Sequence, residues 1–405
     1  MSHARVELAS SGRRMVELDG LRGVAAIVVL AHHTALVLPA VASSFVGGEA
    51  ADQGSAAWWL TSTPLRLLVD GPDAVLVFFV LSGLVLTLPV LRSPGYDWPS
   101  FYSGRLVRLG VPVLGSIVLA YALRLALPPV PSHESEWVSD YRLLDLSWEH
   151  GFRALDLVAG RYSLNNPLWS IRWEMLFSLA LPVFVVAGVV LRRRWLVAAA
   201  VVVGVGWLGF SSGDASARFL PVFLLGSVIA CNLGRIGSAA ASGYRGNPAR
   251  HHALWLLTLV SSLALLLVGP LLSHRLDEGT NEIVQAVAPL GAAGVVLAAI
   301  AWRPVRVALS CTPARLAGKY SFSLYLVHVP VIFAVLCVLP DARFSVTAPL
   351  SVLLSLLLAV GFYHLVEARS HRWARAVGTR SSAALRSIQS RRPGPSSTPE
   401  RTPPE

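Results

Sequence analysis

The stretch LDGLRGVAAIVVLAHH, residues 18–33, combines a long apolar run with ionisable residues. Such a run is typical of a membrane-spanning helix, which needs about 20 apolar residues. Asp19 and Arg22 stand at its start, whereas His32 and His33 stand inside it. Ionisable side chains are costly in hydrocarbon and seldom stay there without a partner or a function. The stretch therefore predicts a transmembrane helix that carries part of a functional site.

The composition indicates that the whole chain is a membrane protein. Of 405 residues, 54% are hydrophobic and only 14% are charged, a balance that is too apolar for an ordinary soluble domain. We therefore expect an all-α fold, a polytopic membrane helix bundle with about ten spans. The expected spans are roughly 20–41, 73–91, 109–128, 168–190, 195–211, 217–234, 253–272, 283–302, 320–339 and 348–366.

The net charge of +11 follows from the expected topology. When the N-terminus is placed in the cytoplasm, every connection on that side is basic, as at Arg92 and at Arg192–Arg194. The segments on the other side hold most of the acids. An excess of Lys and Arg is typical of cytoplasmic loops. We therefore expect both termini in the cytoplasm and no nucleic-acid partner.

The chain divides into three expected parts. Residues 1–14 form a cytoplasmic N-terminal segment, 15–369 the membrane domain, and 370–405, rich in Arg, Ser and Pro, a disordered cytoplasmic tail. The first span also resembles a signal peptide, although its ionisable residues favour an uncleaved helix. The external segment 129–167 fits either a solvated loop or amphipathic helices that lie on the membrane or cap a cavity.

Arg22 and His33 are eleven residues apart, which places them about 20° from the same helical face and about 16 Å apart along the axis. Arg22 then lies near the cytoplasmic edge and His33 lies inside the membrane. An imidazole titrates near neutrality and suits general-base catalysis on a hydroxyl. The alternative is a structural histidine that is hydrogen-bonded to a backbone carbonyl.

The stretch NNPLWSIRWEMLF, residues 165–177, places Glu174 in the fourth span. If this helix starts at the outer membrane surface near Leu168, Glu174 lies about 9 Å deep, close to the depth of His33. A carboxylate beside an imidazole orients the ring and stabilises its protonated form. We therefore expect Glu174 to contact His33. The alternative is a structural ion pair between Glu174 and Arg172.

Two further stretches carry polar side chains. Arg105 and Arg108 share one helical face, and paired guanidinium groups suit phosphate oxygens, although ordinary cytoplasmic anchoring explains them equally well. The stretch GKYSFSLYLVHVPV, residues 318–331, places Tyr325 and His328 in the ninth span, where polar groups either join helices or line a cavity. FFVLSG, residues 78–83, ends in a Ser-Gly pair that permits close helix approach.

Taken together, these stretches resemble the membrane acyltransferase-3 family. The matching fragments are ELDGLRGVAAIVVLAHH, FFVLSG, RLVRLGVP, LWSIRWEMLFSLALP, YSFSLYLVHVPV and FYHLVEARS, which occur in the family's order. The resemblance implies transfer of an acyl group, often acetyl, from cytoplasmic acyl-CoA to a hydroxyl of a carbohydrate or natural product. It places the hallmark Arg and His on Arg22 and His33, and the membrane glutamate on Glu174. His32 and Arg172 depart from the family's pattern.

The resemblance and the residues together predict an O-acyltransferase in a bacterial inner membrane. We expect His33 and Glu174 to be catalytic and no cofactor or metal to be bound, with acyl-CoA as co-substrate and the bilayer as surroundings. A proton-coupled transporter of a lipid-linked sugar or metabolite is the alternative function, and a structural membrane subunit is a third. The expected substrate-binding residues are Arg14, Asp19, Arg22, Arg105, Arg108, Trp169, Tyr325 and His328.

Overall fold

The structure is a computed structural model, and it describes residues 15–130, 133–142 and 164–390. These residues form helices and connecting turns without a strand. Eight helices are long and apolar enough to cross a membrane, or ten if each of two bent helix pairs is one span. This confirms the predicted helical membrane bundle of about ten spans.

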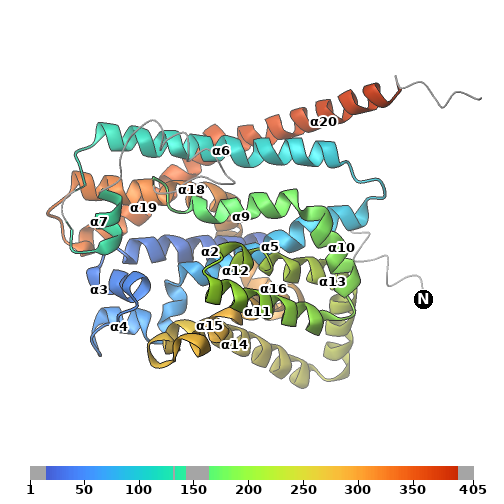
Figure 1. Cartoon of the computed structure of the whole chain (residues 1–405), viewed down its shortest axis with the longest axis horizontal. Coiled ribbons are helices and arrows are strands. Elements are labelled where there is room, and N and C mark those ends of the chain that lie inside the picture. The colour runs from blue at the N-terminus through green and yellow to red at the C-terminus, as the bar shows by residue number, and fades with distance from the viewer. Residues whose placement is uncertain (1–14, 131–132, 143–163, 391–405) are drawn as a thin grey trace, which may run out of the picture.

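The helices pack into one bundle, in which segments far apart in the chain lie side by side (Figure 1). The longer ones are α2 (Val16–Ala35), α5 (Gly71–Arg92), α6 (Trp98–Ala126), α9 (Leu168–Leu179), α10 (Leu181–Leu191), α11 (Trp195–Ser212), α13 (Val222–Gly246), α14 (Pro248–Leu272), α16 (Ala288–Ala301), α18 (Thr312–Val338), α19 (Phe344–Phe362) and α20 (Ala368–Ser390). The shorter ones are α3 (Pro39–Ala42), η1 (Ser43–Gly47), α4 (Ala56–Thr61), η2 (Pro64–Leu68), α7 (Glu136–Arg142), α12 (Ala215–Phe219), η3 (Ser273–Arg275), α15 (Glu278–Ala286), α17 (Arg303–Leu309) and η4 (Tyr363–Glu367).

Helices α2 and α18 form the centre of the bundle. They approach so closely that a Cβ atom at Gly23 or at Gly318 would collide with backbone atoms of the other helix. Membrane helices associate through van der Waals packing, and small residues allow that approach. Most residues of the second half of α18 are buried, from Leu324 through Cys337.

A second close crossing joins α5 to α13. A Cβ atom at Gly83 would collide with the carbonyl oxygen of Phe223, and one at Gly226 with that of Val80. This confirms that the Ser-Gly pair of α5 permits close helix approach. The crossing fixes α5 beside the core, where its N-terminal end faces the cavity described below.

The fifth and sixth spans are joined by a tight turn. Helix α11 ends at Ser212, and Gly213 follows with φ of 73°, a left-handed conformation that glycine adopts without strain. The carboxylate of Asp214 then accepts a hydrogen bond of 2.8 Å from the amide of Ser216 and begins α12. The short SSGD connection therefore separates two spans.

The prediction that residues 370–405 are disordered is wrong for residues 370–390. Helix α20 occupies them and lies along α6 (Figure 1). A small buried residue recurs at every fourth position of this helix, within a segment rich in Arg and Ser. These small residues form a stripe that packs against α6. The stripe comprises Ser370, Ala374, Gly378 and Ser382. Ala374 lies against Gly104, and the Ser382 hydroxyl donates to both carboxylate oxygens of Asp97 at 2.6 and 2.7 Å. Residues 1–14 and 391–405 lie outside the described part of the chain.

Part of the external segment 129–167 is an amphipathic helix, as one alternative predicted. Helix α7 buries Trp137, Val138 and Tyr141 against the end of α18. Tyr141 stacks on Phe333 with ring centres 3.5 Å apart, and burial raises the pKa of this tyrosine to about 12. Residues 143–163 lie outside the described part.

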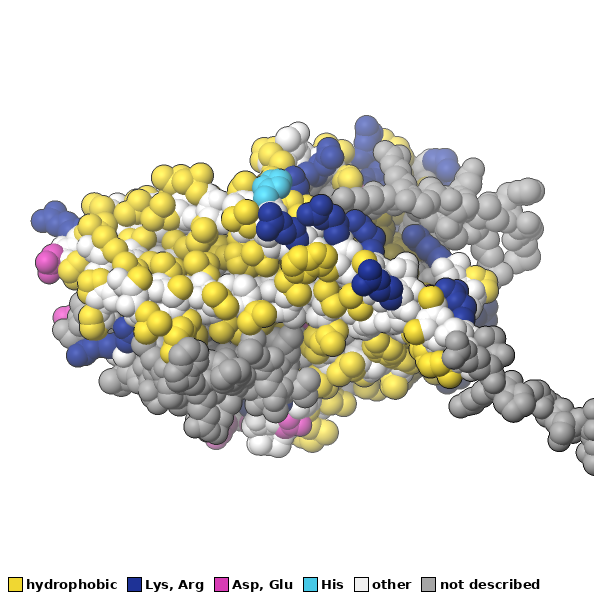
Figure 2. Space-filling model, turned by 90° about the horizontal axis from the view of Figure 1, so that it is seen from above, with side chains coloured by type: hydrophobic (Ala, Val, Ile, Leu, Met, Phe, Trp, Pro, Cys, Tyr) yellow, Lys and Arg dark blue, Asp and Glu magenta, His cyan; other side chains and the backbone are white. Residues whose placement is uncertain are grey.

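Most of the basic side chains visible in one view lie towards one end. In Figure 2 a hydrophobic surface covers much of the left of the view, and most of the visible Lys and Arg side chains cluster to its right. This distribution agrees with the basic connections that the sequence places on one side of the membrane.

Candidate active site

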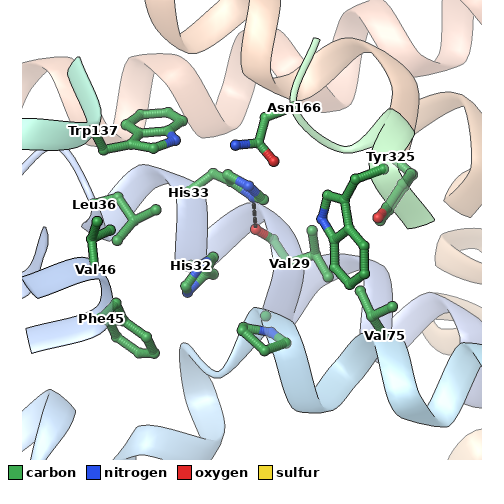
Figure 3. Close-up of a pocket in the computed structure, with 13 residues that line it drawn as sticks. Val29, His32, His33, Leu36, Phe45, Val46, Val75, Trp137, Asn166 and Tyr325 are labelled. Carbon is green, nitrogen blue, oxygen red and sulfur yellow. Dashed lines mark hydrogen bonds between the residues drawn. The ribbon is translucent and has the colours of Figure 1, made fainter. Parts of the chain in front are cut away.

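A cavity of about 170 Å³ surrounds the two histidines at the end of α2 (Figure 3). It is lined by Val29, His32, His33, Leu36, Phe45, Val46, Gly71, Pro72, Val75, Trp137, Asn166, Trp169 and Tyr325. In Figure 3, Trp137 and Asn166 lie next to His33, and Tyr325 lies on the side opposite Phe45. The walls are mainly aromatic and aliphatic, with few polar groups, as is usual for small-molecule sites. We name it the histidine cavity.

His33 is held by two partners. Its Nδ1 lies 3.0 Å from the carbonyl oxygen of Val29 and 3.1 Å from Nε2 of His328. His328 Nδ1 in turn lies 3.0 Å from the carbonyl oxygen of Leu324. A carbonyl only accepts, so each Nδ1 carries a proton in the neutral rings, and His328 Nε2 accepts. The Nε2 atom of His33 is therefore left with its lone pair, as a general base requires.

His32 is bound to a different part of the fold. Its Nδ1 donates to the carbonyl oxygen of Val69 at 2.9 Å, and its ring stands edge-on to Phe45 at 4.7 Å. A Cβ atom at Gly71 would lie 2.7 Å from the His32 ring, so glycine is needed there. His32 thus fixes the start of α5 beside the cavity, whereas His33 is the histidine joined to a second imidazole.

The predicted contact between Glu174 and His33 is not formed. A carboxylate oxygen of Glu174 instead accepts from Arg105 at 2.5 Å and from the Ser82 hydroxyl at 3.2 Å. The depth argument failed because α9 starts at the level of the histidine cavity. Trp169, in its first turn, already lines the histidine cavity, so Glu174 lies about 8 Å further along the axis.

Glu174 belongs to a second group of charges, the arginine cluster, which comprises Arg22, Arg105, Arg108, Glu174 and Glu367. Arg105 also donates through Nε to the Ser178 hydroxyl at 3.0 Å. Arg108 lies within electrostatic reach of the other four members. The Glu367 carboxylate accepts from Ser323 at 2.6 Å and lies 3.7 Å from His371. Three guanidinium groups face two carboxylates, so the cluster has an excess of positive charge that suits an anionic ligand.

The alternative pairing of Glu174 with Arg172 is also not formed. Arg172 lies over the Trp173 ring at 4.9 Å, and its buried Nε has no hydrogen-bond partner in the described part of the chain. Side chains at positions 172 and 174 of one helix point to different faces.

A small second cavity of about 30 Å³ lies beside the arginine cluster, and we name it the inner cavity. It is lined by Arg22, Phe78, Phe79, Ser82, Ser170, Ile171, Glu174, Ser321, Phe322 and Tyr325. Tyr325 therefore borders both cavities. Its hydroxyl lies 2.6 Å from that of Ser170.

Asn165 positions the start of α9 at the histidine cavity. Pro330 has no amide hydrogen, so the carbonyl of Leu326 lacks its usual helical donor. The Asn165 side chain donates to that carbonyl at 2.9 Å and to the Ser116 hydroxyl at 3.2 Å. This bond holds Asn166 and Trp169 against the cavity. The sequence signal was a proline four residues beyond a helical carbonyl, which by itself does not identify the donor.

The other predicted site residues have definite places. Trp169 and Tyr325 line the histidine cavity, and His328 contacts His33. Asp19 lies near the start of α2, where its carbonyl packs against Gly318. Arg14 lies outside the described residues. Sequence reasoning missed Trp137, Asn166, Ser170 and Glu367.

A family model described as an acyltransferase domain, that of the acyltransferase-3 family, matches residues 15–364. The chain belongs to the acyltransferase-3 family. It is therefore a membrane acyltransferase, and the match covers both cavities and most of the arginine cluster. No curated protein and no solved structure matches the chain. Glu367 and helix α20 lie beyond the matched residues of this acyltransferase.

Proposed function

We propose that this acyltransferase moves an acyl group, in the simplest case acetyl, from acyl-CoA to a hydroxyl of a carbohydrate or glycosylated natural product. The observation that carries the proposal is the pairing of His33 with His328, which leaves the His33 Nε2 lone pair available in a cavity. The arginine cluster supports a donor with phosphate groups, because its three guanidinium groups exceed its two carboxylates. A bacterial inner membrane is the proposed location.

The reaction follows from these roles. The acceptor hydroxyl gives its proton to Nε2 of His33 while its oxygen attacks the thioester carbonyl. The carbon–sulfur bond then breaks, and the departing thiolate takes the proton back from His33. The products are the acyl ester and free CoA, so each acyl group transferred releases one thiol. Glu174 and the other carboxylate of the arginine cluster hold the guanidinium groups in place rather than act on the reacting atoms.

The family membership does not favour the transport alternative. A proton-coupled carrier would move its substrate without consuming acyl-CoA, whereas an acyltransferase couples product formation to thiol release.

The test uses the purified full chain in proteoliposomes with acetyl-CoA and an extract of envelope glycans and secreted metabolites. We expect acceptor-dependent release of CoA thiol and a product heavier by one acetyl group in mass spectrometry. The His33→Ala variant serves as the inactive control. Thiol release at the same rate in wild type, His33→Ala and empty liposomes would contradict the proposed function.

A further inference from the structure

The histidine cavity and the inner cavity are stacked along the same helices. On α2, Arg22 borders the inner cavity and Val29 the histidine cavity, about 10 Å further along the axis. On α5, Ser82 borders the inner cavity and Val75 the histidine cavity. Since α5 runs in the opposite direction, both helices place the two cavities in the same spatial order.

The other two lining helices show the same order. On α9, Glu174 borders the inner cavity and Trp169 the histidine cavity. On α18, Ser321 borders the inner cavity and Tyr325 borders both. The four helices therefore enclose one track that leads from the arginine cluster to His33.

The track is interrupted at one level by a pair of side chains. The hydroxyls of Tyr325 and Ser170 lie 2.6 Å apart, and both residues are buried. The Phe78 ring stands edge-on to Tyr325 with ring centres 6.0 Å apart. The hydrogen bond holds the tyrosine ring across the track between α18 and α9.

The inner cavity is too small for a donor in this arrangement. Its volume of about 30 Å³ has room for only one or a few water molecules. The thioester arm of a donor is far larger, so it cannot extend from the arginine cluster to His33 while Tyr325 keeps this rotamer. Rotation of one side chain costs a hydrogen bond and moves no backbone, which makes Tyr325 the element best placed to open.

We propose that Tyr325 and Ser170 form a closable constriction in a single channel, and that the side chain at position 325 determines which acyl groups reach His33. The second clause rests on the proposed function, whereas the first does not. Opening breaks the Tyr325–Ser170 hydrogen bond, and closing after transfer restores the wall between the two cavities.

The first experiment measures passage without any acyl transfer. A cysteine is placed in the histidine cavity by Val29→Cys, in a full-length background whose Cys231, Cys311 and Cys337 are replaced by Ala. A membrane-impermeant methanethiosulfonate reagent is added to inverted vesicles, so that it reaches the arginine-cluster side. We expect slow labelling with Tyr325 present. Labelling should be faster by about fivefold in Ser170→Ala, the factor for loss of one hydrogen bond, and faster still in Tyr325→Ala.

The matched control is Tyr320→Ala, which removes a tyrosine of the same helix that borders neither cavity. It should leave the labelling rate unchanged. Val75→Cys is the second reporter position, in case Val29→Cys does not fold. Equal labelling rates with and without Tyr325, or fast labelling in the background that retains Tyr325, would overturn the constriction.

The second experiment measures donor choice by CoA release from acetyl-CoA and hexanoyl-CoA. Tyr325→Ala should raise the rate for hexanoyl-CoA relative to acetyl-CoA by about tenfold or more, since several buried methylenes gain room. Tyr325→Phe retains the ring and should keep the wild-type ratio. An unchanged ratio in Tyr325→Ala would overturn the specificity role. If wild type uses neither donor, the proposed function fails, while the labelling result still decides the constriction.

Discussion

His33 Nδ1 lies 3.1 Å from Nε2 of His328, a residue 295 positions away in the chain. Because His328 is itself anchored on the carbonyl of Leu324, the pair fixes both the tautomer and the orientation of His33. A second imidazole therefore takes the place that the sequence had suggested for a carboxylate.

Replacing His33 by Ala should abolish the proposed transfer. A positioned general base contributes about 10²- to 10⁴-fold to a rate, so CoA release should fall by at least about 10²-fold. His251→Ala is the control, because this buried histidine of α14 borders neither cavity. If His33→Ala kept full activity while His32→Ala lost it, the base would be His32 instead.

His328 should act by positioning His33. Its variants should differ in whether their side chain can accept the hydrogen bond from His33 Nδ1. His328→Ala leaves the His33 proton with the Val29 carbonyl alone, so kcat should fall, but by less than in His33→Ala. His328→Gln offers a carbonyl oxygen in the same region and should recover part of the loss. Combined with His33→Ala, the His328 substitution should have no further effect, because residues that act as a unit are not additive. Additive losses would indicate an independent role.

The arginine cluster should determine donor affinity. Arg105→Ala removes a guanidinium group that is 9% exposed and bound to Glu174 and Ser178, and a charge-assisted hydrogen bond is worth about 1.5–3 kcal/mol. Together with Arg108→Ala, it should raise the KM for acetyl-CoA by about 10- to 100-fold. Arg235→Ala, an exposed substitution on α13, is the control for total charge. Unchanged binding of acetyl-CoA by the double variant would contradict the phosphate assignment.

The crossing of α2 and α18 should not tolerate a side chain. Gly318→Val places its Cβ against the backbone of Asp19, and overpacking costs about 1–3 kcal/mol or more. We expect a lowered unfolding temperature in detergent. Unfolding is measured by the reaction of the Cys337 thiol, which is buried in the folded protein, with a fluorescent maleimide. Gly234→Val on α13, where a Cβ atom meets nothing within 4 Å, should change little.

The attachment of α20 to α6 should depend on pH through Asp97. Hydrogen bonds from the Ser382 hydroxyl and the Ser100 amide hold the pKa of Asp97 below its usual value of 3.8. A carboxylate with a lowered pKa stabilises the fold fully above that usual value and loses the contribution as the pH falls through the lowered one. The protection of the α20 amides against hydrogen exchange should therefore decrease below about pH 4.

The same attachment can be tested by substitution. Ser382→Ala should increase the exchange of α20 at neutral pH and remove its response to acid. Ser381→Ala is the matched control, because within the described part of the chain that hydroxyl bonds only to the carbonyl of Val377, in its own helix. Equal exchange in both variants would show that Asp97 does not hold the helix.

Local composition was enough to identify the helices and several of the residues that line the two cavities. Long apolar runs identify membrane helices because hydrocarbon cannot satisfy backbone polar groups. Buried ionisable residues such as His33 and Glu174 stand out because their burial is costly. Composition failed at α20, where four small residues at regular spacing matter more than the surrounding Arg and Ser.

The sequence by itself determined a helical membrane acyltransferase of a known family and a short set of residues on which to place chemistry. Only the tertiary structure decided their partners. His33 pairs with His328, Glu174 pairs with Arg105, and Tyr325 separates two cavities. Partners depend on where helices begin relative to one another, and the carbonyl that Pro330 leaves free on α18 binds Asn165 and so sets the start of α9. Periodicity along a single helix gives the face of a residue, but it gives no depth relative to another helix.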